Sequence, residues 1–231
     1  MKKFSFILLL FYMITFSQNK SGEVTYVIKS IDFENKIQNT KNVVDDIKKI
    51  ALEQKFLLSF GEKKSKFLII ENLDKTEGNE KNRMLNKLAT LRFTCDYSYY
   101  LNIEEKLEYF NKNDGALIKV NFTNKSWEIT TESKIIDKYL CYKAIYKYDY
   151  LARDKKVKTR IITAWFAPSL PFSYGPKNYN GLPGLILELQ DWDTTFLATK
   201  IELSDKEIEI DFPKGKTITQ EEYEKKVLSR N

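Results

Sequence analysis

Histidine is missing from the sequence altogether, and its absence removes several kinds of active site from consideration. Hydrolases with a Ser-His-Asp or Cys-His arrangement use an imidazole as the general base, and zinc sites commonly take one as a ligand. The imidazole is also the side chain whose charge ordinarily changes near neutral pH. Any catalysis by this chain would therefore use carboxylates, lysine, tyrosine or a cysteine without a histidine partner.

Glycine, proline and cysteine are scarce as well, at 8, 5 and 2 of 231 residues. So few glycines and prolines exclude fibrous and low-complexity chains, and a hydrophobic content of 42% is too high for a disordered one. The net charge is only +6, and lysine and glutamate alternate along the chain. A nucleic-acid-binding protein more often gathers its basic residues on one face. We expect one globular domain with no nucleic-acid partner.

Long apolar runs are absent except at the amino terminus. Lys2 and Lys3 precede an apolar run over residues 4–16, and Thr15 and Ser17 suit the small-residue positions of a cleavage site. This pattern predicts a signal peptide at residues 1–17 and a mature domain at residues 18–231. No later segment approaches the length of a membrane-spanning helix. We therefore expect an exported protein without a transmembrane anchor, either periplasmic or extracellular, with a peripheral place at the outer membrane also open.

Short segments that alternate apolar and polar residues fill most of the mature chain, as half-buried strands do. Helical spacing occurs at residues 42–52 and 83–91, and residues 219–228 read as a polar helix or tail. These patterns predict a mainly β fold, an antiparallel meander that forms an open curved sheet or half-barrel with short helices covering one face. Strands are expected at residues 23–33, 55–60, 65–73, 95–102, 106–111, 117–122, 126–131, 139–150, 157–167, 185–189, 196–203 and 208–212.

One segment, residues 164–191, differs from the rest by holding four of the five prolines and three of the eight glycines. It reads as the end of a long strand, a structured crossover and a new strand that begins at Leu185. Within it, the run from Leu182 to Leu185 suits a type II turn, because Pro183 presets φ at the second position and Gly184 permits a positive φ at the third. Aromatic side chains in the same segment can pack the crossover onto the sheet.

The hexapeptide from Gly181 to Ile186 resembles the signature of the GLPGLI family of exported bacterial proteins. The aromatic strand before it, the Pro-Phe-Ser-Tyr-Gly-Pro run and the Cys-Tyr-Lys-Ala segment that starts at Cys141 are similar to that family too. The resemblance implies export and fold far more than function, because the family has no established activity. By analogy, its architecture is similar to the half-barrel of periplasmic lipoprotein carriers.

The signature region supplies the residues we select as a candidate binding or structural motif. Turn geometry and core packing explain each of them, and a rim of prolines and aromatic rings also suits a groove for a lipid or a peptide. Both interpretations stay open. The residues are Trp165, Phe166, Pro171, Phe172, Tyr174, Gly175, Pro176, Gly181, Leu182, Pro183, Gly184, Leu185 and Ile186.

Three further patterns leave alternatives open. Cys95 and Cys141 form either one disulfide, as an even count in an oxidising compartment permits, or two separate buried thiols. The Asp191-Trp192-Asp193 run suits a hairpin turn in which tryptophan caps the sheet, and less well a calcium-binding turn. Adjacent carboxylates elsewhere point to different sides of a strand or helix and are expected to be solvated surface.

The sequence therefore indicates a protein that is not an enzyme and that binds no cofactor or metal ion. We expect non-catalytic binding of a lipid, a peptide or an envelope partner. The main alternative is a structural or accessory subunit of an envelope protein complex, which predicts an exposed apolar patch. A carboxylate-based hydrolase would need two acids converging in a cleft, and no spacing in the sequence suggests such a pair.

Overall fold

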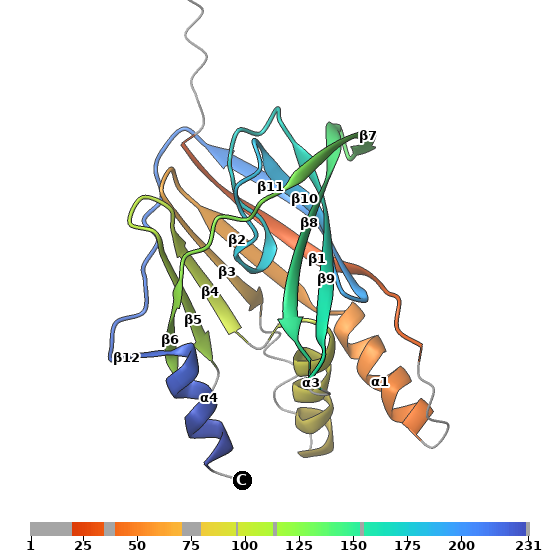
Figure 1. The fold of residues 1–231 in the computed structure, drawn as a ribbon. Helices are drawn as coiled ribbons and strands as arrows, with labels where there is room; N and C mark the ends of the chain where they lie inside the picture. Colours follow the sequence, from red (N-terminus) through yellow and green to blue (C-terminus); the bar gives the residue numbers. More distant parts are fainter. Residues whose placement is uncertain are drawn as a thin grey trace, which may run out of the picture.

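The computed structural model describes residues 20–34, 40–70, 80–95, 97–112, 115–152 and 155–229. The predicted signal peptide at residues 1–17 lies outside the described residues. Strands dominate the described part of the chain and form one sheet (Figure 1). They are β1 (Ser21–Ile31), β2 (Lys55–Phe60), β3 (Lys64–Ile70), β4 (Tyr97–Asn102), β5 (Leu107–Lys112), β6 (Leu117–Asn121), β7 (Glu128–Ile136), β8 (Tyr139–Leu151), β9 (Val157–Ala167), β10 (Leu185–Asp191), β11 (Thr194–Ser204) and β12 (Thr217–Thr219).

The sheet is open, and its strand order is β12-β6-β5-β4-β3-β2-β1-β11-β10-β9-β8-β7. Two antiparallel meanders, β1 to β6 and β7 to β11, join where β1 pairs with β11. All neighbouring strands are antiparallel except β12 and β6, which pair in parallel over three positions. The predicted mainly β fold with an open antiparallel sheet is confirmed.

Most predicted elements are present, with shifted ends. The helices at residues 42–52 and 83–91 correspond to α1 (Lys41–Leu52) and α3 (Glu80–Phe93), and the polar end of the chain is α4 (Gln220–Leu228). The strand predicted at residues 208–212 is wrong, because this segment has no regular structure. Its apolar residues pack across the sheet instead: the ring of Phe212 lies 5.6 Å from Tyr100 and 6.0 Å from Tyr109.

The core lies on the inner face of the sheet, which we define as the face that carries Val24, Tyr26 and Ile28. All three side chains are buried, as period-2 alternation in β1 requires. The crossover between β9 and β10 covers much of this face: the rings of Phe172 and Tyr174 pack, tilted, against Phe60 at centroid distances of 4.6 and 5.7 Å. Thus the crossover itself, more than the helices, fills the hollow of the curved sheet.

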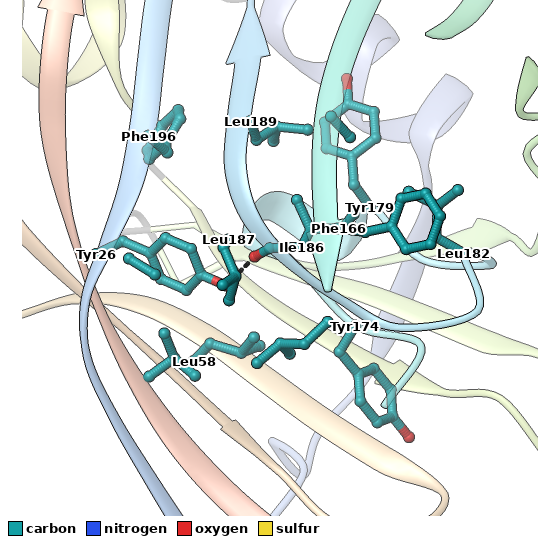
Figure 2. Packing of buried hydrophobic residues seen from close by; sticks show 14 of the residues in the cluster. Tyr26, Leu58, Phe166, Tyr174, Tyr179, Leu182, Ile186, Leu187, Leu189 and Phe196 are labelled. Carbon is teal, nitrogen blue, oxygen red and sulfur yellow. Dashed lines mark hydrogen bonds between the residues drawn. The ribbon is translucent and has the colours of Figure 1, made fainter. Parts of the chain in front are cut away.

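One buried hydrogen bond links β10 to β1 at the centre of the sheet. The hydroxyl of Tyr26 is fully buried and donates to the carbonyl oxygen of Ile186 at 2.5 Å (Figure 2). Around it lie apolar side chains from distant strands, among them Leu58, Leu189 and Phe196. A buried hydroxyl with a partner costs little, so the polar contact fixes the position of β10 without opening the core.

Residues 122–127, which we call the strap, run from β6 near one end of the sheet to β7 at the other end (Figure 1). The strap touches the crossover on its way. The indole Nε1 of Trp127 donates to the carbonyl oxygen of Asn180 at 2.8 Å, and the Trp127 ring packs on Tyr146 and Tyr179. Lys125 of the strap approaches Glu108 of β5 at 3.5 Å. The strap therefore joins the two meanders where no strand pairing does so.

Helices α1 and α3 lie beside each other beyond the ends of the strands, below the sheet in Figure 1. They share a second, smaller apolar cluster that contains Ile47, Ala51, Ala89 and Phe93, with Ile31 from the end of β1 packed against it. Among the residues that the structure describes, no helix combines the length and the hydropathy that crossing a bilayer requires. The carboxyl end of α3 stands next to the β10–β11 turn, and this meeting point forms the site described next.

Candidate functional site

The signature residues are mostly core residues. Phe166, Phe172, Tyr174, Leu182, Leu185 and Ile186 are all at least nine-tenths buried, and Gly175, Pro176 and Gly184 are buried too. Pro171, Gly181 and Pro183 are exposed at turns, and Trp165 is half-buried on the outer face. Their arrangement explains the motif by packing and turn geometry.

Two glycines of the motif are required by close approach. A Cβ on Gly184 would lie 2.3 Å from the carbonyl oxygen of Ala167, and a Cβ on Gly175 would lie 2.8 Å from the Cβ of Ile186. Gly184 also has a φ of +157°, at the edge of the region that favours glycine. These contacts hold the two ends of the crossover against each other.

The turn inside the hexapeptide differs from the predicted type II turn. The amide of Gly184 donates to the carbonyl oxygen of Leu182 at 2.8 Å, and the amide of Leu185 donates to Leu170 at 2.9 Å. A type II turn would instead bond Leu185 back to Leu182. The three-residue turn forms because Leu185 starts β10 and takes its partner from the other end of the crossover.

Trp165 faces away from the crossover, on the outer face of the sheet. The ammonium of Lys134 lies 4.2 Å from the Trp165 ring and 2.7 Å from Glu188, which also pairs with Lys29 at 2.9 Å. The tryptophan therefore covers a surface ion-pair network and does not meet the other signature rings.

Both cysteines are buried thiols, and no disulfide joins them in the described structure. The second of the two alternatives from the sequence therefore holds here, with Cys95 just after α3 and Cys141 in β8. The Cys141 thiol lies 3.5 Å from the carbonyl oxygen of Tyr139, to which it donates. Burial raises the pKa of Cys141 to about 11, so this thiol stays protonated and is a poor nucleophile.

A pocket of about 700 Å³ opens where the carboxyl end of α3 meets the ends of β8 and β9 and the β10–β11 turn. We call it the mouth pocket. None of the thirteen signature residues lines it, although Lys177 of the same crossover does. The lining residues are Leu91, Arg92, Phe93, Thr94, Tyr150, Ala152, Lys158, Arg160, Lys177, Asp191, Trp192, Asp193 and Thr194.

Asp191 sits between two cations at the base of the mouth pocket. Its carboxylate pairs with the guanidinium Nη2 of Arg160 and, at 3.1 Å, with the ammonium of Lys177. Burial by itself would raise the pKa of Asp191, but the charges and hydrogen bonds of Lys177 and Arg160 hold it below its usual value. The carboxylate therefore stays ionised, and both of its oxygens are engaged.

The backbone is strained where it presents these groups. Lys177 and Asn178 have φ values of 53° and 59° in the short 3₁₀ turn η2 (Pro176–Asn178), and Trp192 has a φ of 60°. A side-chain-bearing residue held in this region costs on the order of 1–3 kcal/mol. Three of the six non-glycine residues with positive φ in the described part of the chain therefore lie near this one carboxylate.

Trp192 forms an aromatic wall of the pocket. The side chain is 52% exposed, and its ring lies 4.9 Å from the guanidinium of Arg160 and 6.0 Å from the ring of Tyr150. Asp191 and Thr194 are paired across the turn, so the hairpin turn predicted for this run is present. The alternative of a calcium-binding turn has little support, because the oxygens of Asp191 already accept from Arg160 and Lys177.

The rim of the pocket carries further charge. Asp193 pairs with Arg92 at 2.8 Å, and the Arg92 guanidinium stacks 4.2 Å from the ring of Phe33. Lys158 lies exposed on β9. Across the described residues, no group of three or more cysteine, aspartate or glutamate side chains is placed to hold a metal ion.

Two buried polar atoms of the lining have no hydrogen-bond partner. They are the Nε of Arg160 and the hydroxyl oxygen of Thr194, whose residue is only 1% exposed. Native structures rarely leave such atoms unpaired, and each costs about 1–3 kcal/mol. The mouth pocket thus contains unused donor capacity next to its cations.

Tyrosines behind the pocket act as neutral groups. Burial raises the pKa of Tyr99, Tyr148 and Tyr179 above the usual value, and the charge of Asp191 adds to the effect. The pKa values of these tyrosines are raised and the pKa of Asp191 is lowered, so all of them lie farther from neutral pH. The arrangement is suited to binding, because a general acid or base works best with a pKa near the working pH.

The sequence analysis missed the cations of the pocket, although one signal for them was present. Arg160 lies in β9 on the same face as Ile162, Ala164 and Phe166, which are all buried. A charged residue in register with three core positions of a strand indicates an internal ion pair. The place of Lys177 had no such signal, because it depends on the left-handed backbone of η2.

A family model described as a protein of unknown function, Porph_ging, matches residues 149–188, which include the hexapeptide. No curated protein sequence matches the chain. Two crystal forms of PNGF-II share the fold: each superposes with a TM-score of 0.53 at 14% identity over 90% of this chain. The chain spans only 33% of the PNGF-II structure. LprF from Mycobacterium bovis aligns at 10% identity over 85% of this chain and 89% of its own, with a TM-score of 0.23, too low to indicate a common fold.

Proposed function

We propose that this chain is an exported, non-catalytic binding protein of the GLPGLI family and that it holds its ligand in the mouth pocket. The observation that carries the proposal is the pocket itself, in which charged and aromatic side chains from separate elements converge. Ligand sites of this kind favour the mouths of curved sheets, where a few polar groups orient the ligand beside an aromatic wall.

A peptide suits the pocket better than a lipid. The inner face of the sheet, where an acyl chain would lie, is filled by Phe172, Tyr174 and their neighbours. The pocket offers Arg, Lys, Asp and Thr side chains beside one exposed indole, a mixture that suits a backbone with polar groups and an occasional apolar side chain. Export to the periplasm or beyond, through residues 1–17, would bring the chain to envelope peptides and proteins.

The non-catalytic part of the proposal rests on the state of the carboxylates. Asp191 and Asp193 each accept from a cation in the pocket, so neither is placed as the uncommitted acid or base that a carboxylate-based hydrolase requires. Cys141 is buried and protonated. Binding is therefore the simpler role for these residues.

One observation supports the alternative of an accessory subunit. Ile135 and Leu140 lie opposite each other on β7 and β8 and expose 72% and 49% of their surfaces, and Ile129 on the same edge strand exposes 51%. Exposed apolar side chains at a sheet edge are typical of surfaces that contact other proteins. Leu140 lies at the start of β8, whereas Tyr150, which lines the mouth pocket, lies near the end of the same strand.

The test is native mass spectrometry of the mature chain, residues 18–231, incubated with a tryptic digest of serum albumin. We expect peptide adducts that Trp192→Ala abolishes, and that Trp165→Ala, the same change on the outer face, leaves in place. Absence of any adduct, or equal loss in both variants, would sink the proposal. A lipid adduct on the chain purified from its own envelope would show that the ligand is a lipid and not a peptide.

A further inference from the structure

The mouth pocket has a surplus of positive charge. Four cationic side chains line it, those of Arg92, Lys158, Arg160 and Lys177, against the two carboxylates of Asp191 and Asp193. A cleft with a surplus of one charge focuses the field of those groups between its low-dielectric walls. The local field therefore attracts an anionic group and disfavours a cationic one.

Both carboxylates of the pocket are already used. Asp193 accepts from Arg92 at 2.8 Å, and Asp191 accepts from Arg160 and Lys177, with a side-chain exposure of only 3%. A cationic ligand would have to compete with these internal partners. The arrangement leaves no acid to receive it, so the preference for an anion follows from the contacts as well as from the count of charges.

The unpaired polar atoms point to the same chemistry. The Nε–H of Arg160 can only donate, and the hydroxyl of Thr194 has no acceptor within hydrogen-bond distance. The Thr194 hydroxyl can donate as well as accept, so an acceptor oxygen would satisfy both groups. A carboxylate supplies two, and hydrogen bonds between charged groups are about twice as strong as neutral ones.

We propose that the mouth pocket recognises a carboxylate of a peptide, held by Arg160 and Thr194 and attracted by Lys158, with the adjoining side chain against Trp192. This inference rests on the proposed function. A peptide can present the carboxylate at its carboxyl terminus or on an aspartate or glutamate side chain, and the chemistry of the pocket is the same for both.

The experiment uses two pairs of N-acetylated tripeptides that differ only in charge, titrated into the mature chain and followed by calorimetry. Gly-Phe-Leu with a free carboxyl terminus is compared with its carboxamide, and Gly-Glu-Leu amide with Gly-Gln-Leu amide. We expect the acid of at least one pair to bind about tenfold more tightly than its neutral twin. Which pair shows the difference identifies the source of the carboxylate.

Thr194→Val tests the site without disturbing the fold, because the hydroxyl it removes has no partner. We expect the acid peptide to bind about three- to tenfold more weakly, with the melting temperature unchanged or higher. Thr195→Val, the same change on the opposite face of β11 and outside the pocket, is the control and leaves affinity unchanged.

Lys158→Gln separates recognition from general attraction. It should weaken the acid peptide and spare the neutral twin, whereas Lys200→Gln on the exposed part of β11 should change neither. Equal binding of acid and neutral twins overturns the carboxylate and leaves the proposed function standing. Binding by no member of either pair overturns both, and equal effects of the two lysine variants overturn the assignment to this pocket.

Discussion

Gly184 has no Cβ, and this allows the start of β10 to contact the end of β9. Its α-carbon packs against the peptide between Ala167 and Pro168, where an added Cβ would lie 2.3 Å from the Ala167 carbonyl oxygen. The obstacle is backbone on both sides, so no side chain can rotate to relieve it. The contact closes the loop of the crossover at the point where β9 ends and β10 begins.

We therefore expect Gly184→Ala to lower the free energy of unfolding by about 2–3 kcal/mol, from overpacking together with the unfavourable φ. Urea denaturation of the two proteins measures the difference. Gly61→Ala is the matched control, because its nearest atom would be 3.5 Å from the new Cβ, an ordinary contact. Equal destabilisation by both changes would show that the close approach at Gly184 is not what the motif requires.

At the scale of elements, the strap depends on an ion pair that water reaches poorly. The side chains of Glu108 and Lys125 are 7% and 10% exposed, and their nearest charged atoms are 3.5 Å apart. Burial raises the pKa of Glu108 and lowers the pKa of Lys125, and each partner only partly offsets the shift of the other. Since desolvation costs more than a long ion pair returns, the pair fixes the path of the strap at a cost in stability.

The raised pKa of Glu108 has a definite pH dependence. The folded protein takes a proton on this group more readily than the unfolded chain, whose carboxyl titrates near the ordinary value of 4.5. The stability that this group contributes is thus fully present below that value and is lost as the pH rises through the raised pKa. We expect the free energy of unfolding of the protein, relative to that of Glu108→Gln, to fall as the pH rises above 4.5.

Urea denaturation across that pH range measures the difference, with Glu104→Gln, an exposed glutamate paired with Lys63 at 2.6 Å, as the comparison. A difference that rises with pH for Glu108→Gln would contradict the assignment of burial as the dominant effect.

The helices and strands also show how much of the fold can be predicted from the sequence. Alternation predicted most of the strands correctly, because each buries one face against the same core. It predicted a strand at residues 208–212 that is absent, since apolar spacing does not distinguish a strand from a segment that packs Phe212 across the sheet. The mouth pocket could not be predicted from local sequence patterns, because its residues come from distant parts of the chain. Arg92 and Asp193, for example, are brought to 2.8 Å only by the fold.

At the scale of the whole molecule, the sheet order places β1 and β11 near the centre and β7 and β12 at the two ends. Amides of central strands are bonded on both sides and open only with the larger structure, whereas an edge strand frays. We expect peptides from β1 and β11 to exchange hydrogen for deuterium most slowly, and those from β7 and β12 fastest, in exchange followed by mass spectrometry. Equal protection of β1 and β7 would contradict the strand order.

The position of β1 between β2 and β11 determines when each of its two edges can be paired as the chain is delivered. Ser21 and Ile31 find their β11 partners only at Ser204 and Thr194. A polypeptide delivered amino end first therefore carries one bare strand edge until nearly all of it has arrived. High contact order makes such folding slow, and an unsatisfied apolar edge invites association in the interval. Association through β1 is therefore a hazard for as long as β11 has not arrived.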